Sequence, residues 1–282
     1  MPYRRRYATR RRPVRRYNRR STTAFKPKRY GRRTTTRYRR KTSTRMSKRR
    51  ILDLTTTKKK DNKRMYDPAN VTNNFFSMPR GGTSYLYCPT AMGRENNNVA
   101  SVRNNSTVYM KGLSEKMELS PTNGKTWKWR RIVFSTKGFR PASSYIATTD
   151  GYLRLWRAMA PADEFVLADR VFQGLATTDF GTYFTGKVDT NRVKLHMDKT
   201  TVLGSGNQNA YLRSYNHWIP MEKNFRYDED ENGDEYSSSP WSAEGNYNLG
   251  DVFIWDIFTD VGADTADTLT VRSGTTLYWH EK

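Results

Sequence analysis

The distribution of charge along the chain limits what its first quarter can fold into. Residues 1–65 hold 28 basic and 2 acidic residues, a net charge of +26, whereas residues 66–282 hold 23 basic and 25 acidic residues, a net charge of −2. Large apolar side chains are rare in the first segment, so burial cannot offset the entropy lost on ordering it. The sequence therefore predicts a disordered basic arm over 1–65. It is joined to a near-neutral domain over 66–282 that is long enough for one core.

The second segment has the pattern of a β protein. Thr, Tyr, Val, Phe and Trp are common there, and Asn, Gly, Pro and Ser separate short apolar runs. The candidate strands are residues 84–88, 107–113, 127–135, 151–159, 182–188, 192–198, 216–227, 251–258 and 268–280. Ser273-Gly274 lies between two strand-like halves of the last range, so we expect a hairpin there.

One helix is expected, in PADEFVLADRVFQGLA (161–176). Pro161 and two acids start it, and Phe165, Ala168, Phe172 and Leu175 follow at helical spacing. Eight or nine short strands with one helix in a connection indicate an all-β sandwich or barrel, of which the eight-stranded jelly roll is one form.

The run DVFIWDIF (251–258) is apolar on both faces, as in a strand that is covered on both sides. Its large side chains Trp255 and Phe258 suit a core, or alternatively a contact with a neighbouring subunit.

Motifs for catalysis, metals or cofactors are weak. NGKT (123–126) resembles part of a phosphate loop, but Leu119 stands where the first glycine should be and Trp127 where the helix should begin, so we expect a turn. The three histidines, His196, His217 and His280, have no zinc-site spacing. The sequence predicts no catalytic residue, no metal site and no cofactor, and hence no enzyme.

An acidic segment, YDEDENGDEY (227–236), matches the first half of a calcium-binding loop. Ser239 stands where such a loop needs its bidentate glutamate, so an EF-hand is excluded. A solvated hairpin tip built on Asn232-Gly233 fits the pattern. A cation site of another kind remains open for Asp228–Glu235, as does a loop on the outside of an assembly.

Cysteine use and hydropathy constrain the compartment. Cys88 is the single cysteine, so no intrachain disulfide forms and a reducing compartment is expected. No apolar stretch follows the basic start as in a secretory signal, and no run suits a membrane span, so no membrane partner is expected. A mitochondrial transit peptide would need an amphipathic helix, which Pro13, Pro27 and Gly31 oppose.

The arm has the composition of a nucleic-acid-binding segment. Arginine binds phosphate through its planar fork, and each phosphate that is neutralised releases counterions. Tyrosine rings between the arginines can stack on unpaired bases, which favours single strands. RRPVRR (11–16) and KRR (48–50) also suit nuclear import. The predicted binding residues are Arg4, Arg5, Arg6, Arg10, Arg11, Arg12, Arg15, Arg16, Arg19, Arg20, Arg32, Arg33, Arg39, Arg40, Lys48, Arg49, Arg50, Tyr3, Tyr7 and Tyr17.

The start MPYRRR, the cluster KRRILDLTTTKKKDNKRM, and the motifs YMKGL, WKWRRIVF, YDEDENGD, GDVFIWDIF and TLYWHEK together resemble capsid proteins of genomoviruses. More distantly the layout resembles geminivirus and circovirus capsid proteins. The resemblance implies a jelly-roll subunit, a T=1 icosahedral shell of about 60 copies, and an inward arm that packages circular single-stranded DNA. It also implies import by the host nuclear machinery, and so a protein of the virion and the host nucleus.

Two other classes stay open. A non-viral nucleic-acid-binding protein, ribosomal or chromatin-like, would use the same arm without assembly, but the near-neutral charge of residues 66–282 disfavours it. An enzyme such as a nuclease with a DNA-tethering tail would need a metal or nucleophile pattern, and we find none in the sequence.

Overall fold

The computed structural model describes residues 46–70, 75–79, 81–97, 99–204, 206, 209–245, 248–262 and 267–282. These belong to one unit, Met46–Lys282, which is separate from Met1–Arg45. The boundary that we expected after residue 65 therefore falls inside the folded unit.

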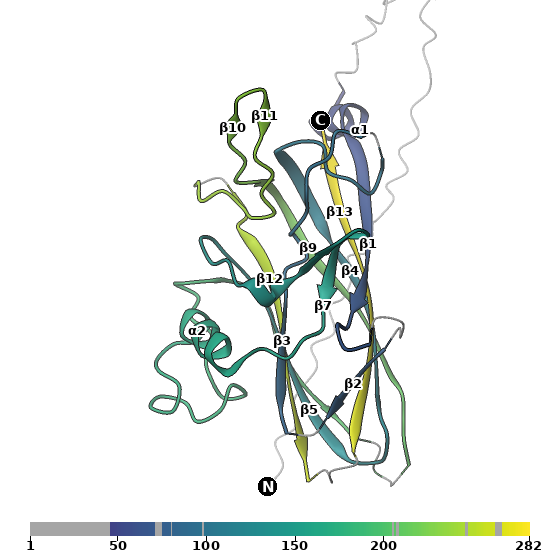
Figure 1. The fold of residues 1–282 in the computed structure, drawn as a ribbon, viewed down its shortest axis with the longest axis vertical. Coiled ribbons are helices and arrows are strands. Elements are labelled where there is room, and N and C mark those ends of the chain that lie inside the picture. The colour runs from purple at the N-terminus through teal and green to yellow at the C-terminus, as the bar shows by residue number, and fades with distance from the viewer. Residues whose placement is uncertain are drawn as a thin grey trace, which may run out of the picture. The chain divides into compact units, whose positions relative to one another are not determined.

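The described elements are mostly strands (Figure 1). The helical segments are α1 (Lys48–Thr55), the 3-10 turn η1 (Ala142–Ser144) and α2 (Pro161–Val171). The strands are β1 (Thr57–Tyr66), β2 (Phe76–Pro79), β3 (Thr83–Tyr87), β4 (Thr107–Pro121), β5 (Thr126–Thr136), β6 (Ile146–Thr148), β7 (Gly151–Leu155), β8 (Lys194–Leu203), β9 (Arg213–Arg226), β10 (Glu231–Asn232), β11 (Glu235–Tyr236), β12 (Asp251–Val261) and β13 (Thr268–Glu281). None of the helices within the described residues is long and apolar enough to cross a membrane.

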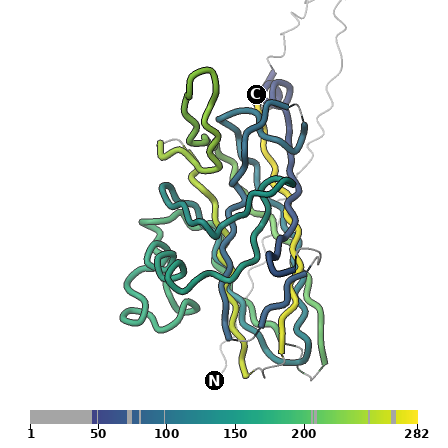
Figure 2. The backbone as a smooth tube through the Cα atoms, in the orientation of Figure 1, coloured from purple at the N-terminus to yellow at the C-terminus, as the bar shows by residue number. Residues whose placement is uncertain are grey.

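Eight of the strands form an antiparallel jelly roll. One sheet contains the order β1-β13-β4-β9, and the other has the order β3-β12-β5-β8. Strands that are far apart in the sequence lie side by side, so that the C-terminal β13 runs between β1 and β4 (Figures 1 and 2). Two four-stranded sheets wound in this way are the jelly-roll architecture, and the predicted all-β fold is confirmed.

Additional strands extend the first sheet. β7 pairs in parallel with the end of β1, β6 pairs with β7, and β2 pairs with the start of β13. The sheet that contains β1, β13, β4 and β9 is called the large sheet below.

Several sequence predictions are corrected by the structure. β13 is one continuous strand through Ser273-Gly274, and the expected hairpin there is wrong. Residues 182–188 form turns and one isolated bridge at Val188 instead of a strand. β4 extends to Pro121, well beyond the expected residue 113, and β7 ends at Leu155. The turn expected at Asn123-Gly124 is confirmed, since β5 begins at Thr126 with no helix after it.

The long connection between β5 and β8 adds a third layer. It contains α2, which begins at the predicted Pro161 but buries Leu167, Ala168 and Val171, while Phe165 and Leu175 are exposed. The predicted helix is thus present, and its buried face is rotated from the predicted one. The loop after the helix adds the buried residues Phe172, Phe180 and Val188.

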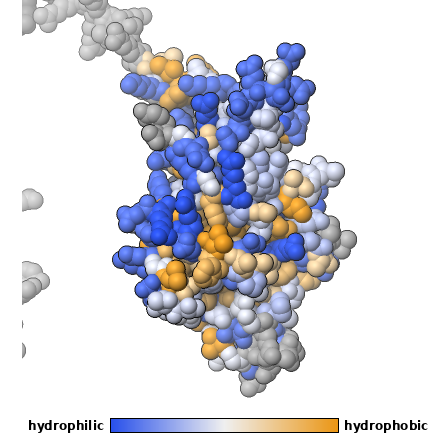
Figure 3. All heavy atoms as spheres, turned by 60° about the vertical axis from the view of Figure 1, so that its left-hand side comes forward, coloured by the Kyte–Doolittle hydropathy of each residue, from blue (hydrophilic) through white to orange (hydrophobic). Residues whose placement is uncertain are grey.

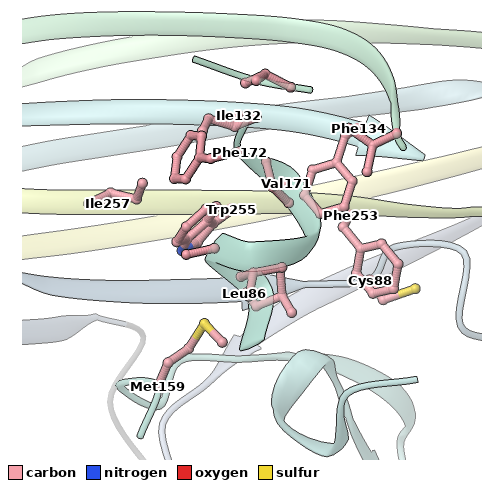
Figure 4. Packing of buried hydrophobic residues seen from close by; sticks show 14 of the residues in the cluster. Leu86, Cys88, Ile132, Phe134, Met159, Val171, Phe172, Phe253, Trp255 and Ile257 are labelled. Carbon is pink, nitrogen blue, oxygen red and sulfur yellow. The ribbon is translucent and has the colours of Figure 1, made fainter. Parts of the chain in front are cut away.

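This third layer covers the outer side of β12 and β5. Trp255 lies against Phe172, with ring centroids 5.3 Å apart, and Phe253 stacks on Phe134 at 5.5 Å (Figure 4). Between the two sheets lie the other faces of the same strands, including Ile254 and Phe258. β12 is buried on both faces as predicted, and Trp255 and Phe258 belong to the core of the subunit itself.

A band of charged side chains crosses the space between the sheets and separates two apolar clusters. Glu115 on β4 accepts hydrogen bonds from the guanidinium groups of Arg131 and Arg154. Asp256 on β12 accepts from Arg131 Nε at 2.7 Å and from Arg154 Nη2 at 2.6 Å. All four side chains are buried. Two positive and two negative charges therefore balance each other inside the sandwich.

Candidate nucleic-acid interface

The predicted binding residues fall mainly before the described unit. Seventeen of the twenty lie in residues 1–45, outside the described residues. The other three, Lys48, Arg49 and Arg50, form the first turn of α1, where Lys48 and Arg50 are exposed. Ser47 caps this helix, and its hydroxyl accepts from the Arg50 backbone N–H at 3.3 Å. Positive charge at a helix N-terminus opposes the helix dipole, so helix stability does not explain this basic turn.

β1 divides the second basic cluster into two groups. Lys59 and Lys63 point into the protein, where Lys63 Nζ donates to the carbonyl of Ala91 at 2.7 Å and Lys59 Nζ to that of Val102 at 2.8 Å. Burial lowers the pKa of Lys63 to about 8. Lys58 and Lys60 alternate with them and are exposed. Lys58 and Lys60 lie outside the core and face outward with the large sheet, as does Arg64, which pairs with Asp150 on the surface.

The outward face of the large sheet carries four rings, which we call the aromatic strip: Tyr109, Trp218, Tyr278 and His280. The Trp218 and Tyr278 ring centroids lie 5.8 Å apart, and those of Tyr109 and His280 lie 6.0 Å apart. Tyr278 and His280 alternate along β13 with Leu277 and Trp279, which are buried. The strand period of two therefore places the four rings on one face.

Trp218 owes its position to a glycine. Gly112 on β4 pairs with Pro220 on β9, and the Trp218 indole reaches over it, so that a Cβ at Gly112 would come within 2.7 Å of Trp218 Cζ2. The missing side chain lets the indole lie across the neighbouring strand. Trp218 is 49% exposed, whereas Trp127, Trp255 and Trp279 are buried. A large apolar ring is thus held in place at the surface.

A groove of about 1180 Å³ lies beside the strip, between α1 and the strands. We call it the basic groove. Its walls include Tyr109 and His280 of the strip, together with Lys58, Lys111 and Lys282. One acid, Asp53 on α1, also lines it and lies 3.4 Å from Lys58 Nζ. Lysines thus outnumber acids at the edge of the aromatic strip.

The protonation of His280 reflects these surroundings. Burial, followed by the charges of Lys58 and Lys111, lowers its pKa below the usual range. The ring is therefore neutral at neutral pH and presents a flat, uncharged surface. Lys111 Nζ also lies 2.5 Å from Glu222, an exposed pair of the kind that contributes little to stability and that a competing anion can replace.

The acidic segment forms a hairpin, as the Asn232-Gly233 pattern predicts. β10 pairs with β11, and Gly233 at the tip has a φ of +66°. Glu229 points inward, where Arg103 Nη2 lies 2.5 Å from its carboxylate. Among the residues that the structure describes, no group of three His, Cys, Asp or Glu side chains is placed to hold a metal ion.

His196, Asp198 and Cys88 are engaged within the fold. His196 lies 3.1 Å from the Ser135 hydroxyl, while Asp198 on the same strand accepts from Arg130 at 2.9 Å. Cys88 is buried, and burial raises the pKa of its thiol to about 12. His196 and Asp198 therefore have different partners, and the Cys88 thiol lies in the core.

A second cleft, of about 510 Å³, lies between the α2 layer and the outer side of β3 and β12. It contains Lys128, whose ammonium lies 4.7 Å from the Phe184 ring, and Glu164, whose pKa burial raises. With one lysine and one glutamate, this cleft adds no net positive charge to the surface.

Sequence reasoning placed Lys58 and Lys60 in a disordered arm and did not identify the aromatic strip. In both β1 and β13, exposed and buried residues alternate along the sequence with a period of two. TKKKDNKRM alternates outward and inward lysines, and TLYWHE alternates Tyr278 and His280 with buried residues. The rings on β4 and β9 join them only through strand pairing, which the sequence does not show.

Comparisons with known proteins give little. No family model matches the sequence, and no curated protein matches it. Among solved structures, VP1 of Trichodysplasia spinulosa-associated polyomavirus is 9% identical, over 80% of this chain and 79% of that chain, at a TM-score of 0.10. VP1 of Merkel cell polyomavirus in complex with disialyllactose is 6% identical, over 79% and 76%, at 0.11. The infectious bursal disease virus Gt strain structure is 13% identical, over 73% and 40%, at 0.09. At such TM-scores the likeness supports no conclusion about function.

Proposed function

We propose that the chain is a viral coat subunit that assembles into a closed shell and packages single-stranded DNA with its basic N-terminal segment. The observation that carries this proposal is the combination of an eight-stranded jelly roll with a long basic segment that has no acidic residue before Asp53. The jelly roll is an architecture of viral capsids. The basic segment suits a polyanion held by many copies of the subunit.

The amount of charge agrees with a packaging role. Residues 1–65 carry a net charge of +26, of which Lys59 and Lys63 are used inside the fold. A symmetric shell of about 60 copies would therefore bring roughly 1,400 positive charges to its contents. This is comparable to the phosphates of a genome of about two thousand nucleotides, with small cations neutralising the remainder.

The composition of the segment favours single-stranded DNA over a duplex. Tyr3, Tyr7 and Tyr17 are interleaved with arginines, and tyrosine rings can stack only on bases that are not already stacked in a helix. Arginine forks hold phosphates without reading the sequence. A packaging protein needs this sequence-independent binding.

The folded unit also offers apolar surface for assembly. Phe165 and Val166 on α2 and Leu175 after it are exposed. Figure 3 turns the α2 side of Figure 1 forward and shows apolar side chains gathered over the middle of that face. Exposed apolar patches mark contact surfaces between proteins, and a second copy of the subunit would bury this one in a shell.

The first test compares the full chain with a variant that lacks residues 1–45. Both are examined by negative-stain electron microscopy, and nuclease-protected nucleic acid is extracted from the same fractions. We expect shells from both proteins and protected DNA only from the full chain. As a matched control, a variant with the ten arginines of residues 1–20 changed to lysine keeps the charge and should keep most of the loading.

Three outcomes would contradict the proposal. Wild-type DNA loading by the truncated protein would contradict the packaging role of the arm. Soluble monomers of the full chain that coat DNA would favour a non-viral binding protein. Cleavage of DNA by the purified protein in the presence of magnesium would favour an enzyme.

The proposal includes entry into the host nucleus through the runs RRPVRR and KRR. Residues 1–50 fused to a fluorescent reporter should accumulate in the nucleus of a host cell. A fusion in which the arginines of both runs are changed to glutamine serves as the control, and equal nuclear accumulation of the two fusions would contradict this part.

A further inference from the structure

The outward face of the large sheet combines two features that usually occur apart. The four rings of the aromatic strip lie on the surface. Within the described residues no apolar side chain covers Trp218, whose exposed fraction is 49%. Lysines border the rings, because Lys60 pairs with Tyr278 and Lys58 with His280 across β1 and β13. Surfaces that bind single-stranded nucleic acid combine stacking rings with a positive groove in this way.

We propose that the aromatic strip and the basic groove form a second nucleic-acid site, which holds unpaired bases of a single strand against the folded subunit. This inference rests on the proposed function and adds to it a site outside the basic arm. The arm supplies most of the charge, whereas the strip supplies ring faces that are fixed in position by the sheet.

The spacing of the rings favours a single strand. Tyr278 and His280 are two residues apart on β13, which corresponds to about 6.8 Å. Nucleotides that stay stacked repeat at about 3.4 Å, so neighbouring rings leave room for bases that have separated from one another. A duplex has no free base faces and could use only the lysines.

The charges lie where the phosphates of such a strand would run. Lys58 and Lys60 are on β1 at one side of the strip, and Lys111 is on β4 beside Tyr109. The partners of Lys58 and Lys111 are the exposed acids Asp53 and Glu222. Pairs of this kind are weak, so a phosphate can take the place of either carboxylate.

The position of the groove also suits this role. α1 forms one wall of the groove, and the chain enters the folded unit at Met46, two residues before that helix. The groove therefore lies close to the point at which the described part of the chain begins. The basic first turn of α1, which does not stabilise the helix, also lies at the start of the folded unit.

The test uses the full chain and a fluorescein-labelled oligothymidylate of about 20 nucleotides, with binding followed by anisotropy over a range of salt concentrations. We expect Trp218→Leu with Tyr278→Leu to weaken binding about tenfold or more, with the salt dependence unchanged because the phosphate contacts remain. Lys58→Gln with Lys60→Gln should instead lower the slope of log affinity against log salt by about 0.7 for each lysine. Tyr236→Leu, on the β10–β11 hairpin and 60% exposed, is the matched control and should bind as the wild type does.

A second measurement does not depend on how well the variants fold. The wild-type protein is photo-crosslinked to an oligonucleotide that contains 5-iodouracil, and the crosslinked peptides are mapped by mass spectrometry. We expect crosslinks at the peptides that contain Tyr109, Trp218 and Tyr278. Crosslinks confined to residues 1–45, together with wild-type affinity of the ring variants, would overturn this inference and leave the packaging role of the arm intact. No binding of the oligonucleotide by the full chain would overturn both.

Discussion

Removing one charge from the buried band should cost far more stability than removing one from the surface. In Asp256→Asn, the side chain keeps its size but loses its charge. The Asp256 carboxylate accepts from Arg131 Nε at 2.7 Å, Arg131 Nη2 at 2.9 Å, Arg154 Nη2 at 2.6 Å and Trp129 Nε1 at 2.9 Å. An amide NH₂ in place of one oxygen would direct its hydrogens at guanidinium groups that also donate. The substitution therefore leaves buried donors without an acceptor and the band with a net positive charge.

The magnitude follows from the burial of the band. Glu115, Arg131, Arg154 and Asp256 are each at most 1% exposed, so water does not compensate the lost charge. Breaking a buried ion pair by removing one partner costs about 3–5 kcal/mol. For a unit of this size, that corresponds to a fall in Tm of about 6–20 °C. The free energy of unfolding of a domain is about 5–15 kcal/mol, so the variant would lose a large part of it.

The assay is urea and thermal unfolding of the unassembled subunit, followed by tryptophan fluorescence and circular dichroism. Asp150→Asn is the control, because Asp150 pairs with Arg64 at 2.9 Å on the surface and its loss should cost less than about 1 kcal/mol. Adding Arg154→Met to Asp256→Asn restores charge balance, and the double variant should lose at least about 1 kcal/mol less than the sum of the two single losses. An Asp256→Asn variant within about 1 kcal/mol of the wild type would refute the reasoning.

Three further predictions concern titration and reactivity. Burial disfavours the ionised form of Glu115, but Arg131 and Arg154 outweigh this effect and lower the pKa of Glu115 to about 2. The stability that this carboxylate contributes should be lost as pH falls from about 4.5 to 2. Denaturant titrations of Glu115→Gln should not show this loss. Burial raises the pKa of Asp251 to about 6, so the folded state holds its proton more tightly than the unfolded state and stability should fall as pH rises from about 4 to 6; a profile in that window unchanged by Asp251→Asn would contradict this. Cys88, buried and with a raised thiol pKa, should react with a thiol reagent only after urea unfolds the protein, and fast labelling of the native protein would show that this core opens.

Most strands could be predicted because their local pattern and their tertiary role agree. The expected hairpin at Ser273-Gly274 failed because its signal has another cause. β2 pairs with β13 from Thr268 to Val271, and β1 pairs with it from Gly274 to Glu281. The small residues lie where β13 changes from one partner to the other, while β4 pairs with it throughout. Composition cannot tell such an exchange of neighbours from a turn.

β1 was missed for a different physical reason. Its many lysines give a net charge that is typical of disorder, and charge averaged over a window hides alternation. In the structure the outward lysines of this segment stay in solvent. The inward Lys59 and Lys63 donate to backbone carbonyls, and Lys59 also pairs with Glu281. Buried lysines occur where acceptors are in place, and those acceptors come from residues far along the chain. The helix α1 was missed for the same reason, because the charge averaged over a window is also high there.

The buried band shows how far a sequence could have led. Its members are charged residues among mainly apolar neighbours at the inward positions of their strands, as Asp256 is between Ile254 and Phe258 and Glu115 between Leu113 and Met117. A charge in that position requires a partner, and two acids with two arginines supply a balanced set. The sequence thus carries the demand for an internal ion network. It does not show the pairing, because Asp256 and Arg131 are neighbours only through the pairing of β12 with β5, and Glu115 and Arg154 reach them only from β4 and β7 of the large sheet. The same strand pairing assembles the aromatic strip on the opposite side of the large sheet. Both sites are therefore products of the jelly-roll topology, and a substitution that shifts the register of β4 should disturb both together.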